Sequence, residues 1–260
     1  MFSREINSHV YVISIDICFV LLGMVFFAVL SLVVGLTILL SGLFMVKAAR
    51  YAYRVYQHRA ESISKFREVM NPKNTSLPLF SANKRVSAMV MLGSGGHTAE
   101  LLTALEEIPR SIFNSLTYVI ADTDRSSLIR ATKVEEKFNS NEILHFVTLP
   151  RAREVGQSFM TSVFTTLYAL MFAFKVVYFS RPDVLLVNGP GSCVPLCWAA
   201  VFFNILGISQ TKIIFIESFT RIKHLSLSGK LLYPLVDRFI VQWPQLQEQH
   251  ALAEYIGILC

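Results

Sequence analysis

Apolar and polar positions divide the chain into one long uncharged stretch followed by shorter periodic segments. Residues 17–46 contain no charged side chain, and a helix that spans a bilayer needs about 20 apolar residues. We therefore expect one transmembrane anchor over residues 17–46, behind a short N-terminus over residues 1–16. A cleaved signal peptide fits poorly, because the apolar stretch is too long and no basic cluster precedes it.

Charges on either side of the anchor predict its orientation. The downstream flank carries Lys47, Arg50, Arg54 and Arg59, whereas the upstream flank has no net positive charge. By the positive-inside rule, the C-terminal side lies in the cytosol and the N-terminus in the lumen. Residues 47–85 are expected to form a basic juxtamembrane helix and a linker. The linker contains the sequon Asn74-Thr75-Ser76, which this orientation keeps from glycosylation.

From Val86 onward, strand-like runs alternate with helical patterns. The expected strands are Val86–Leu92, Leu116–Ala121, Ile143–Thr148, Val184–Val187, Lys212–Ile216 and Arg238–Val241. The expected helices are His97–Ile108, Ser126–Lys137, Ser158–Phe179, Ser192–Leu206 and Ser226–Leu235. This alternation predicts an α/β domain over residues 86–242, a Rossmann-like doubly wound parallel sheet.

Two stretches of this domain, Ser158–Ser180 and Val194–Ile208, are almost free of charge. We expect them to be buried or membrane-contacting helices of the domain rather than further spans.

Composition adds a bias toward anionic partners. The chain carries a formal charge of +6 and is 53% hydrophobic, which suits work beside an anionic membrane or on phosphorylated substrates. No nucleic-acid partner is indicated, because the basic residues form no tract outside the juxtamembrane region. The four cysteines form neither a disulfide framework nor a C-x-x-C pair, so we expect reduced buried thiols and no metal site.

Two glycine-rich loops are candidates for phosphate binding. Gly93-Ser94-Gly95-Gly96 joins the first expected strand to a helix, and Gly189-Pro190-Gly191 precedes Ser192, a good N-cap residue. Loop amides and the positive end of a helix attract anions. The spacing matches neither G-x-G-x-x-G nor a P-loop, so plain strand-to-helix turns are the alternative. If the loops lie at neighbouring strand ends, they can grip both phosphates of a diphosphate.

Other strand ends carry further polar candidates. Arg151, Arg153 and Glu154 follow one strand, where arginine suits phosphate recognition and a solvated loop is the alternative. Asp122 and Asp124 follow another strand, where they suit either a ribose contact or a helix cap.

His97 and Glu217 are the candidates for acid–base chemistry. His97 lies in the first turn of its helix, where a neutral imidazole can take a proton from an attacking hydroxyl; a histidine that only orients the loop is the alternative. Glu217 follows an apolar strand and is expected to face a cleft, with Ser218 and Arg221 beside it. It fits a base, a ligand for a sugar hydroxyl, or a carboxylate at a helix N-terminus.

Five motifs behind an N-terminal anchor carry a family resemblance: LGSGGHTAELL, IADTDRSS, LPRAREVGQS, VNGPGSC and IESFTR. Together they resemble the membrane-anchoring subunits of the eukaryotic UDP-N-acetylglucosamine (UDP-GlcNAc) transferase that adds the second sugar to dolichyl diphosphate. The resemblance runs from about Val86 to the C-terminus. The wider relative is the bacterial lipid II glycosyltransferase, whose two Rossmann-like domains form a GT-B fold.

The resemblance implies the acceptor-binding half of a two-chain, inverting glycosyltransferase of N-glycan precursor synthesis. Such a subunit is inactive alone and recruits a soluble donor-binding catalytic subunit to the cytosolic face of the endoplasmic reticulum, as a heterodimer or larger complex. The partner binds most of the donor, and neither cofactor nor metal is implied. The acceptor GlcNAc-diphosphodolichol would be held by Gly93, Ser94, Gly95, Gly96, Gly189, Gly191 and Ser192. Arg151, Arg153, Glu154, Ser218 and Arg221 would support the site, and His97 or Glu217 would deprotonate the O4 hydroxyl.

The resemblance also implies that the last residues, 243–260, contact the partner. Their apolar side chains include Leu246, Leu252, Tyr255, Ile256, Ile258 and Leu259, which fit an apolar docking surface. A C-terminal helix that packs on its own domain is the alternative. Two rival functions differ in class: a pure scaffold for a fully active partner, and a dinucleotide-dependent oxidoreductase.

Overall fold

The computed structural model describes residues 2–69, 85–138, 143–154, 156–189 and 191–259. Contacts divide the chain into two units, Met1–Ala49 and Arg50–Cys260, and each is considered by itself. The predicted linker falls almost wholly outside the described residues, and so does its sequon at Asn74.

Helix α1 (Phe2–Val69) supplies the whole of the first unit. Its described side chains between Met24 and Val46 are all exposed, apart from the half-buried Phe44. At about 1.5 Å per residue, the uncharged stretch 17–46 is roughly 45 Å long, which exceeds a hydrocarbon core of about 30 Å. An apolar helix without protein around it requires a nonpolar solvent, so this part of α1 is a candidate membrane span, as the predicted anchor requires.

The rest of α1 belongs to the second unit. Tyr51, Val55, Arg59 and Ile63 are all buried, and their spacing of four residues places them on one face of the helix. Arg59 donates hydrogen bonds to the carbonyls of Tyr233 and Leu252, and its guanidinium lies 4.8 Å from the centre of the Tyr233 ring. The helical part of the predicted juxtamembrane segment therefore packs on the domain through this face.

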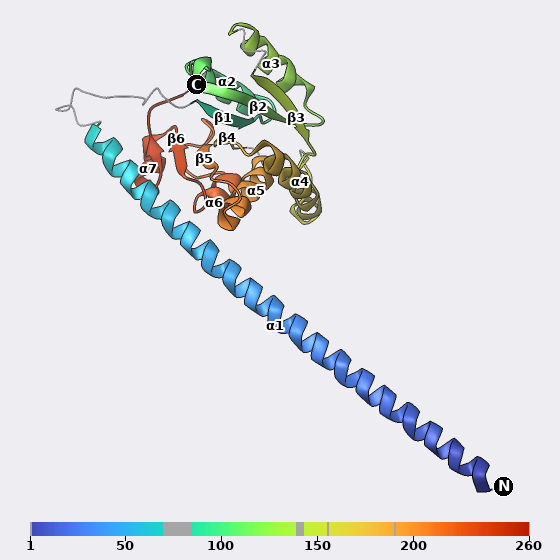
Figure 1. Cartoon of the computed structure of the whole chain (residues 1–260). Coiled ribbons are helices and arrows are strands. Elements are labelled where there is room, and N and C mark those ends of the chain that lie inside the picture. The colour runs from blue at the N-terminus through green and yellow to red at the C-terminus, as the bar shows by residue number, and fades with distance from the viewer. Residues whose placement is uncertain (1, 70–84, 139–142, 155, 190, 260) are drawn as a thin grey trace. The chain divides into compact units, whose positions relative to one another are not determined.

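Seven parallel strands form the sheet of the second unit, in the order β3-β2-β1-β4-β5-β6-β7 (Figure 1). They are β1 (Val86–Met91), β2 (Phe113–Ala121), β3 (Leu144–Leu149), β4 (Val184–Asn188), β5 (Lys212–Ile216), β6 (Arg238–Val241) and β7 (Glu254–Tyr255). The predicted doubly wound sheet and its first six strands are confirmed. β7 was not predicted, because a two-residue strand has no measurable alternation.

Two apolar clusters cover the two faces of the sheet, because neighbouring strand residues point in opposite directions. Met89 and Met91 of β1 join one cluster, and Ala88 and Val90 join the other. Figure 1 shows helices α2 (Gly96–Glu106) and α3 (Arg125–Glu136) on one side of the sheet and α4 (Phe159–Ser180) and α5 (Cys193–Leu206) on the other. The expected helices are confirmed, and α6 (Leu227–Leu232) is shorter than expected.

Of the two uncharged stretches, α5 is a core helix. Nine of its side chains are buried, among them the free thiols of Cys193 and Cys197. Burial raises the pKa of Cys197 well above its usual value, so this thiol stays protonated, as predicted for a buried cysteine. Among the side chains of α4 whose burial is described, residues 160–180, the buried ones are Ser162, Ala169, Ala173 and Val177, and many of the others form an exposed apolar face.

The C-terminal residues pack on their own domain. Helix α7 (Pro244–Gln249) places Leu246 in the core at 0% exposure, and β7 extends the sheet beside β6. Leu246 is therefore not available for the predicted docking surface. Leu252, Tyr255, Ile256 and Leu259 are half-buried, and Ile258 is 53% exposed.

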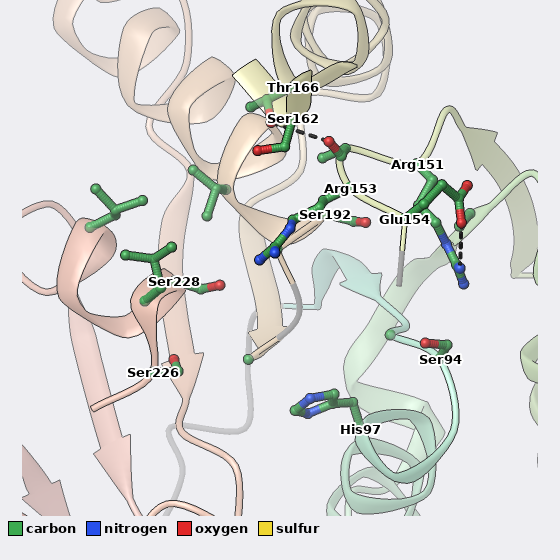
Figure 2. Close-up of a pocket in the computed structure, with 18 of the residues that line it drawn as sticks. Ser94, His97, Arg151, Arg153, Glu154, Ser162, Thr166, Ser192, Ser226 and Ser228 are labelled. Carbon is green, nitrogen blue, oxygen red and sulfur yellow. Dashed lines mark hydrogen bonds and ion pairs between the residues drawn. The ribbon is translucent and has the colours of Figure 1, made fainter. Parts of the chain in front are cut away.

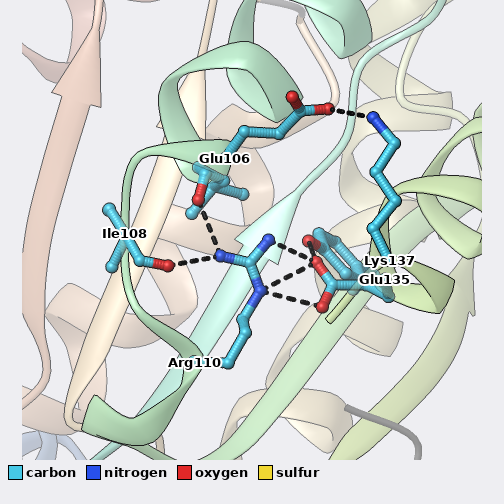
Figure 3. Close-up of polar contacts among 7 residues, drawn as sticks. Glu106, Ile108, Arg110, Glu135 and Lys137 are labelled. Carbon is cyan, nitrogen blue, oxygen red and sulfur yellow. Dashed lines mark hydrogen bonds and ion pairs between the residues drawn. The ribbon is translucent and has the colours of Figure 1, made fainter. Parts of the chain in front are cut away.

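A buried ion pair ties α2 to α3 and β2 (Figure 3). Arg110 donates to both carboxylate oxygens of Glu135, at 2.9 Å from Nε and 2.7 Å from Nη2, and to the carbonyls of Leu105 and Ile108. Tyr118 donates to the same carboxylate at 2.7 Å, and burial, together with this negative charge, raises the Tyr118 pKa. Every buried polar atom of the group has a hydrogen-bonding role.

Arg110→Met is expected to lower the free energy of unfolding by about 3–5 kcal/mol, because it removes the cation that balances a buried carboxylate. The matched control is Lys137→Met, which breaks the exposed Lys137–Glu106 pair and should cost less than about 1 kcal/mol. Denaturant unfolding of the full chain in detergent micelles measures both. Equal losses of stability in the two variants would show that the buried Arg110–Glu135 pair stabilises the domain no more than an exposed pair does.

Candidate functional site

The two glycine loops lie side by side at the carboxyl edge of the sheet. β1 pairs with β4 in register from Ala88↔Val184 to Met91↔Val187, so the loops that follow these strands are neighbours. The strand order also reverses between β1 and β4. In doubly wound sheets, ligands bind at this switch point. The two glycine loops therefore follow neighbouring strands, as binding both phosphates of one diphosphate would require.

Side chains from α2 and α3 hold the first loop in place. The carbonyl of Gly93 accepts hydrogen bonds from Thr98 and Ser127. Asp124 caps α3 by accepting from the amide of Ser127 at 3.1 Å. Burial opposes ionisation of Asp124, but hydrogen bonds from Ser127 and Ser126 outweigh it and lower the pKa. Of the two roles predicted for Asp124, the structure shows the helix cap.

Helices α2 and α5 both begin at this edge without a side-chain cap. Gly95 precedes α2 with φ +65°, a conformation that favours glycine. Ser192 precedes α5, but its side chain makes no cap hydrogen bond, which corrects the prediction that it caps the helix. By contrast, side chains cap α3, α4 and α6. The first amides of α2 are therefore available to an anion. At the start of α5 the amide of Val194 donates to the carbonyl of Gly191 at 3.3 Å, and Pro195 has no amide hydrogen, so only the loop amides of Gly191 and Ser192 face the cavity there.

A cavity of about 580 Å³ opens between these loops, the β3–α4 loop and the start of α6 (Figure 2). Ten predicted site residues line it: Gly93, Ser94, His97, Arg151, Arg153, Glu154, Gly189, Gly191, Ser192 and Arg221. In Figure 2, Ser94 and His97 lie on one side, Ser226 and Ser228 on another, and Ser162 and Thr166 of α4 close the end. Its walls combine three cations, several hydroxyls and apolar side chains.

The remaining predicted residues do not line this cavity. Gly95 and Gly96 are exposed outside its lining, and Ser218 is buried. Glu217 was expected to face a cleft, and instead it is 0% exposed. Its carboxylate accepts hydrogen bonds from the amides of Ser218 and Ser226. Burial raises the Glu217 pKa, against the effect of these hydrogen bonds. A carboxylate enclosed in this way supports the start of α6 and is not placed to contact a substrate.

His97 is the cavity residue with the best-defined surroundings. Its Nδ1 lies 2.9 Å from Oδ1 of Asn188, which is fully buried at the end of β4. The ring packs under Gly189, where an added Cβ would lie 2.8 Å from Cε1 of His97. Gly189 also has φ +37°. The second glycine loop therefore both approaches and positions the histidine of the first.

Several functional candidates were missed in the sequence. Asn188 is part of the VNGPGSC motif, but no role was assigned to it. Glu100 accepts a hydrogen bond from Asn188 at 2.9 Å, and its position three residues after His97 places both on one face of α2. That H-x-x-E spacing was the available signal. Ser226, Ser228 and Trp198 also line the cavity, and they carry no local pattern.

Comparison with known proteins assigns the family. The sequence model described as "Oligosaccharide biosynthesis protein Alg14 like" matches residues 88–259. The chain belongs to the Alg14 family. The "UDP-N-acetylglucosamine transferase subunit ALG14" of Candida albicans is 42% identical over 65% of this chain and 76% of that protein. The proteins of the same name from Rattus norvegicus and Homo sapiens are 43% and 41% identical, over 81% and 82% of their lengths.

Solved structures with a similar arrangement are glycosyltransferases. MurG of Acinetobacter baumannii aligns at a TM-score of 0.41 with 15% identity, over 61% of this chain and 42% of MurG. The calicheamicin glycosyltransferase CalG4 aligns at 0.40 with 14% identity, over 67% and 53%. The Alg14-family sequence matches cover all five motifs, so both glycine loops, His97 and Glu217 lie inside the family region.

Proposed function

We propose that this chain is the membrane-anchoring, acceptor-binding subunit of a two-chain UDP-GlcNAc transferase. The reaction adds the second GlcNAc to GlcNAc-diphosphodolichol in N-glycan precursor synthesis. Membership of the Alg14 family and the names of its relatives support the transferase assignment. The observation that carries the acceptor role is the cavity, which is lined by the uncapped start of α2, the second glycine loop, three arginines and His97.

A diphosphate fits these surroundings. The first amides of α2 and the amides of Gly191 and Ser192 follow adjacent strand ends, which allows each loop to bind one phosphate. Arg153 and Arg221 line the same cavity and supply positive charge, and Arg151 is held by Glu154 at 3.1 Å. One guanidinium group can donate two parallel hydrogen bonds to the oxygens of a phosphate. We assign the anionic part of the acceptor to this cavity.

His97 is then the general base. As the O4 oxygen forms its bond to the anomeric carbon of the donor, the O4 proton passes to Nε2 of His97. The bond between that carbon and the donor diphosphate breaks, and its electron pair leaves with UDP. Attack from the face opposite the leaving group inverts the anomeric centre. Glu217 supports the loop after β5 and takes no part in the proton transfer.

The outer face of α4 supports a lipid-linked acceptor. Met160, Phe164, Met171 and Phe179 are between 69% and 82% exposed, and the helix is long and apolar enough to be a membrane-span candidate. The same helix contributes Val163 and Leu167 to the wall of the cavity, which Leu227 and Leu231 of α6 also line. We infer that this face lies in the bilayer and that the isoprenoid chain leaves the cavity along it.

Met171→Asp is expected to raise KM for a polyprenyl acceptor about tenfold, since a charge placed in lipid costs at least about 1–2 kcal/mol. The matched control is Ile129→Asp on α3, a side chain 56% exposed on the opposite layer. Kinetics of the membrane-bound complex with long-chain acceptor provide the measurement. A similar KM for both variants would place α4 away from the bilayer.

The second chain supplies the donor site in this proposal. We assign its docking surface to the half-buried residues Leu252, Tyr255, Ile256 and Leu259 and place the complex on the cytosolic face of the endoplasmic reticulum, where the basic flank of the anchor belongs. UDP-GlcNAc would bind mainly to that partner.

The test is sugar transfer from UDP-GlcNAc to a lipid diphosphate-GlcNAc, with this chain alone and with a soluble donor-binding partner. Activity only in the mixture is the expected result. Activity of this chain alone would contradict a donor site on a second chain. If the His97 variant described below were fully active in the mixture, the pure-scaffold alternative would be favoured.

A further inference from the structure

We propose that Glu100 and Asn188 are positioning residues that hold the proton of His97 on Nδ1 and leave Nε2 free to accept one. The hydrogen bonds of the two side chains carry this assignment. Nδ2 of Asn188 donates to Oε2 of Glu100 at 2.9 Å, so Oδ1 must be the atom that faces Nδ1 of His97 at 2.9 Å. An amide oxygen only accepts, and therefore Nδ1 must be the donor.

Glu100 is itself fixed by the loop that follows β5. Its Oε1 accepts from the Ser218 hydroxyl at 3.0 Å, and its Oε2 accepts from the amide of Phe219 at 3.3 Å. The indole Nε1 of Trp243 donates to the Phe219 carbonyl at 2.7 Å, and the two rings lie 5.0 Å apart. The carboxylate thus meets only donors, which prevents the Asn188 amide from reversing.

The orientation of Asn188 decides what His97 can do. If the amide reversed, its NH2 group would face Nδ1, and the imidazole proton would move to Nε2. That tautomer cannot take a proton from an acceptor hydroxyl. With the observed orientation, the neutral imidazole carries its lone pair on Nε2, and Nε2 makes no hydrogen bond within the part of the chain that the structure describes. When Nε2 takes up a proton, the positive imidazolium keeps its hydrogen bond to Oδ1 of Asn188, and the Glu100 carboxylate beyond that amide stabilises the charge.

Two substitutions of Glu100 separate orientation from charge. Glu100→Ala removes the acceptor and frees the Asn188 amide to reverse. Glu100→Gln keeps an acceptor for the Asn188 amide, because the glutamine oxygen can face Asn188 and Phe219 while its NH2 group donates to Ser218. Glu106→Ala on the same helix removes an exposed ion pair with Lys137 and is the control.

The direct readout is the His97 tautomer, followed by long-range ¹H–¹⁵N correlations on the full chain labelled with ¹⁵N-histidine in detergent micelles. Comparison with His97→Gln assigns the signal among the six histidines. The native chain and the Glu100→Gln variant should carry the proton on Nδ1, and the Glu100→Ala variant should shift it toward Nε2. A native proton on Nε2 overturns the proposal without any variant, and so does an unchanged tautomer in folded Glu100→Ala.

Sugar transfer supplies the second readout, which rests on the proposed function. In the complex, Glu100→Ala should lower kcat about 10- to 100-fold with KM for the acceptor almost unchanged, since a wrong tautomer removes the base and not the binding site. Glu100→Gln should recover most of that loss. If the native complex transferred no sugar while the tautomer behaved as expected, the proposed function would fail and the positioning role would stand.

Discussion

His97→Gln lowers kcat of the assembled transferase by about 10²–10⁴-fold, the contribution of a general base to proton transfer. Glutamine keeps a polar side chain near Asn188 but does not take up a proton. Because the substitution leaves in place the arginines and loop amides assigned to the phosphates, KM for the acceptor should change little. Initial rates over a range of acceptor concentrations, with complex formation checked by co-purification, provide the measurement.

The matched control is His145→Gln, at an exposed position on β3, which should transfer sugar at the native rate. If the His97 variant stayed within a few-fold of native activity, His97 would not be the general base, and the base would have to come from elsewhere in the complex. Loss of the complex together with activity would instead point to a structural role for His97.

Gly189→Ala should have the second largest effect, a loss of about 100-fold. The new Cβ would lie 2.8 Å from Cε1 and 3.1 Å from Nδ1 of His97, so the ring must leave its position beside Asn188. A displacement of about 1 Å is enough to cost this much in an enzyme. The variant also places an alanine at φ +37°, which adds backbone strain. Transfer rates and unfolding of the same preparations measure the two effects.

Gly207→Ala separates strain from displacement. Gly207 ends α5 with φ +78°, and an added Cβ there meets no atom within 4 Å. This control should lose stability but keep its rate of transfer. Equal rates for the two variants would mean that the Gly189 loop does not set the position of His97.

The sequence was sufficient for the parts of the fold that depend on local pattern. Apolar runs located six of the seven strands, and the glycine loops fell at the switch point because strand order places β1 beside β4. The sequence was also sufficient to place His97 in the site, because His97 directly follows the first glycine loop. The four-residue stripe from Tyr51 to Ile63 was visible too, but the sequence assigned this segment only to a basic juxtamembrane helix.

The parts that failed depend on distant residues. Asn188 and Glu100 are 88 residues apart in sequence, and only the sheet brings them together. Glu217 occupies a strand end like those of the site residues, but Gly229 lets α6 approach closely enough to enclose it, with an added Cβ there only 2.4 Å from Oε2. Leu246 fits an apolar docking surface as well as a core, and tertiary packing decides between them.

The central claim is that this chain holds the acceptor, and binding to the purified full chain without its partner tests it most directly. Equilibrium binding in nanodiscs would compare a radiolabelled isoprenoid diphosphate-GlcNAc with UDP-GlcNAc. We predict that the chain binds the lipid acceptor, that Arg153→Gln weakens this binding, and that UDP-GlcNAc does not bind. Binding of UDP-GlcNAc without the lipid acceptor would contradict the account.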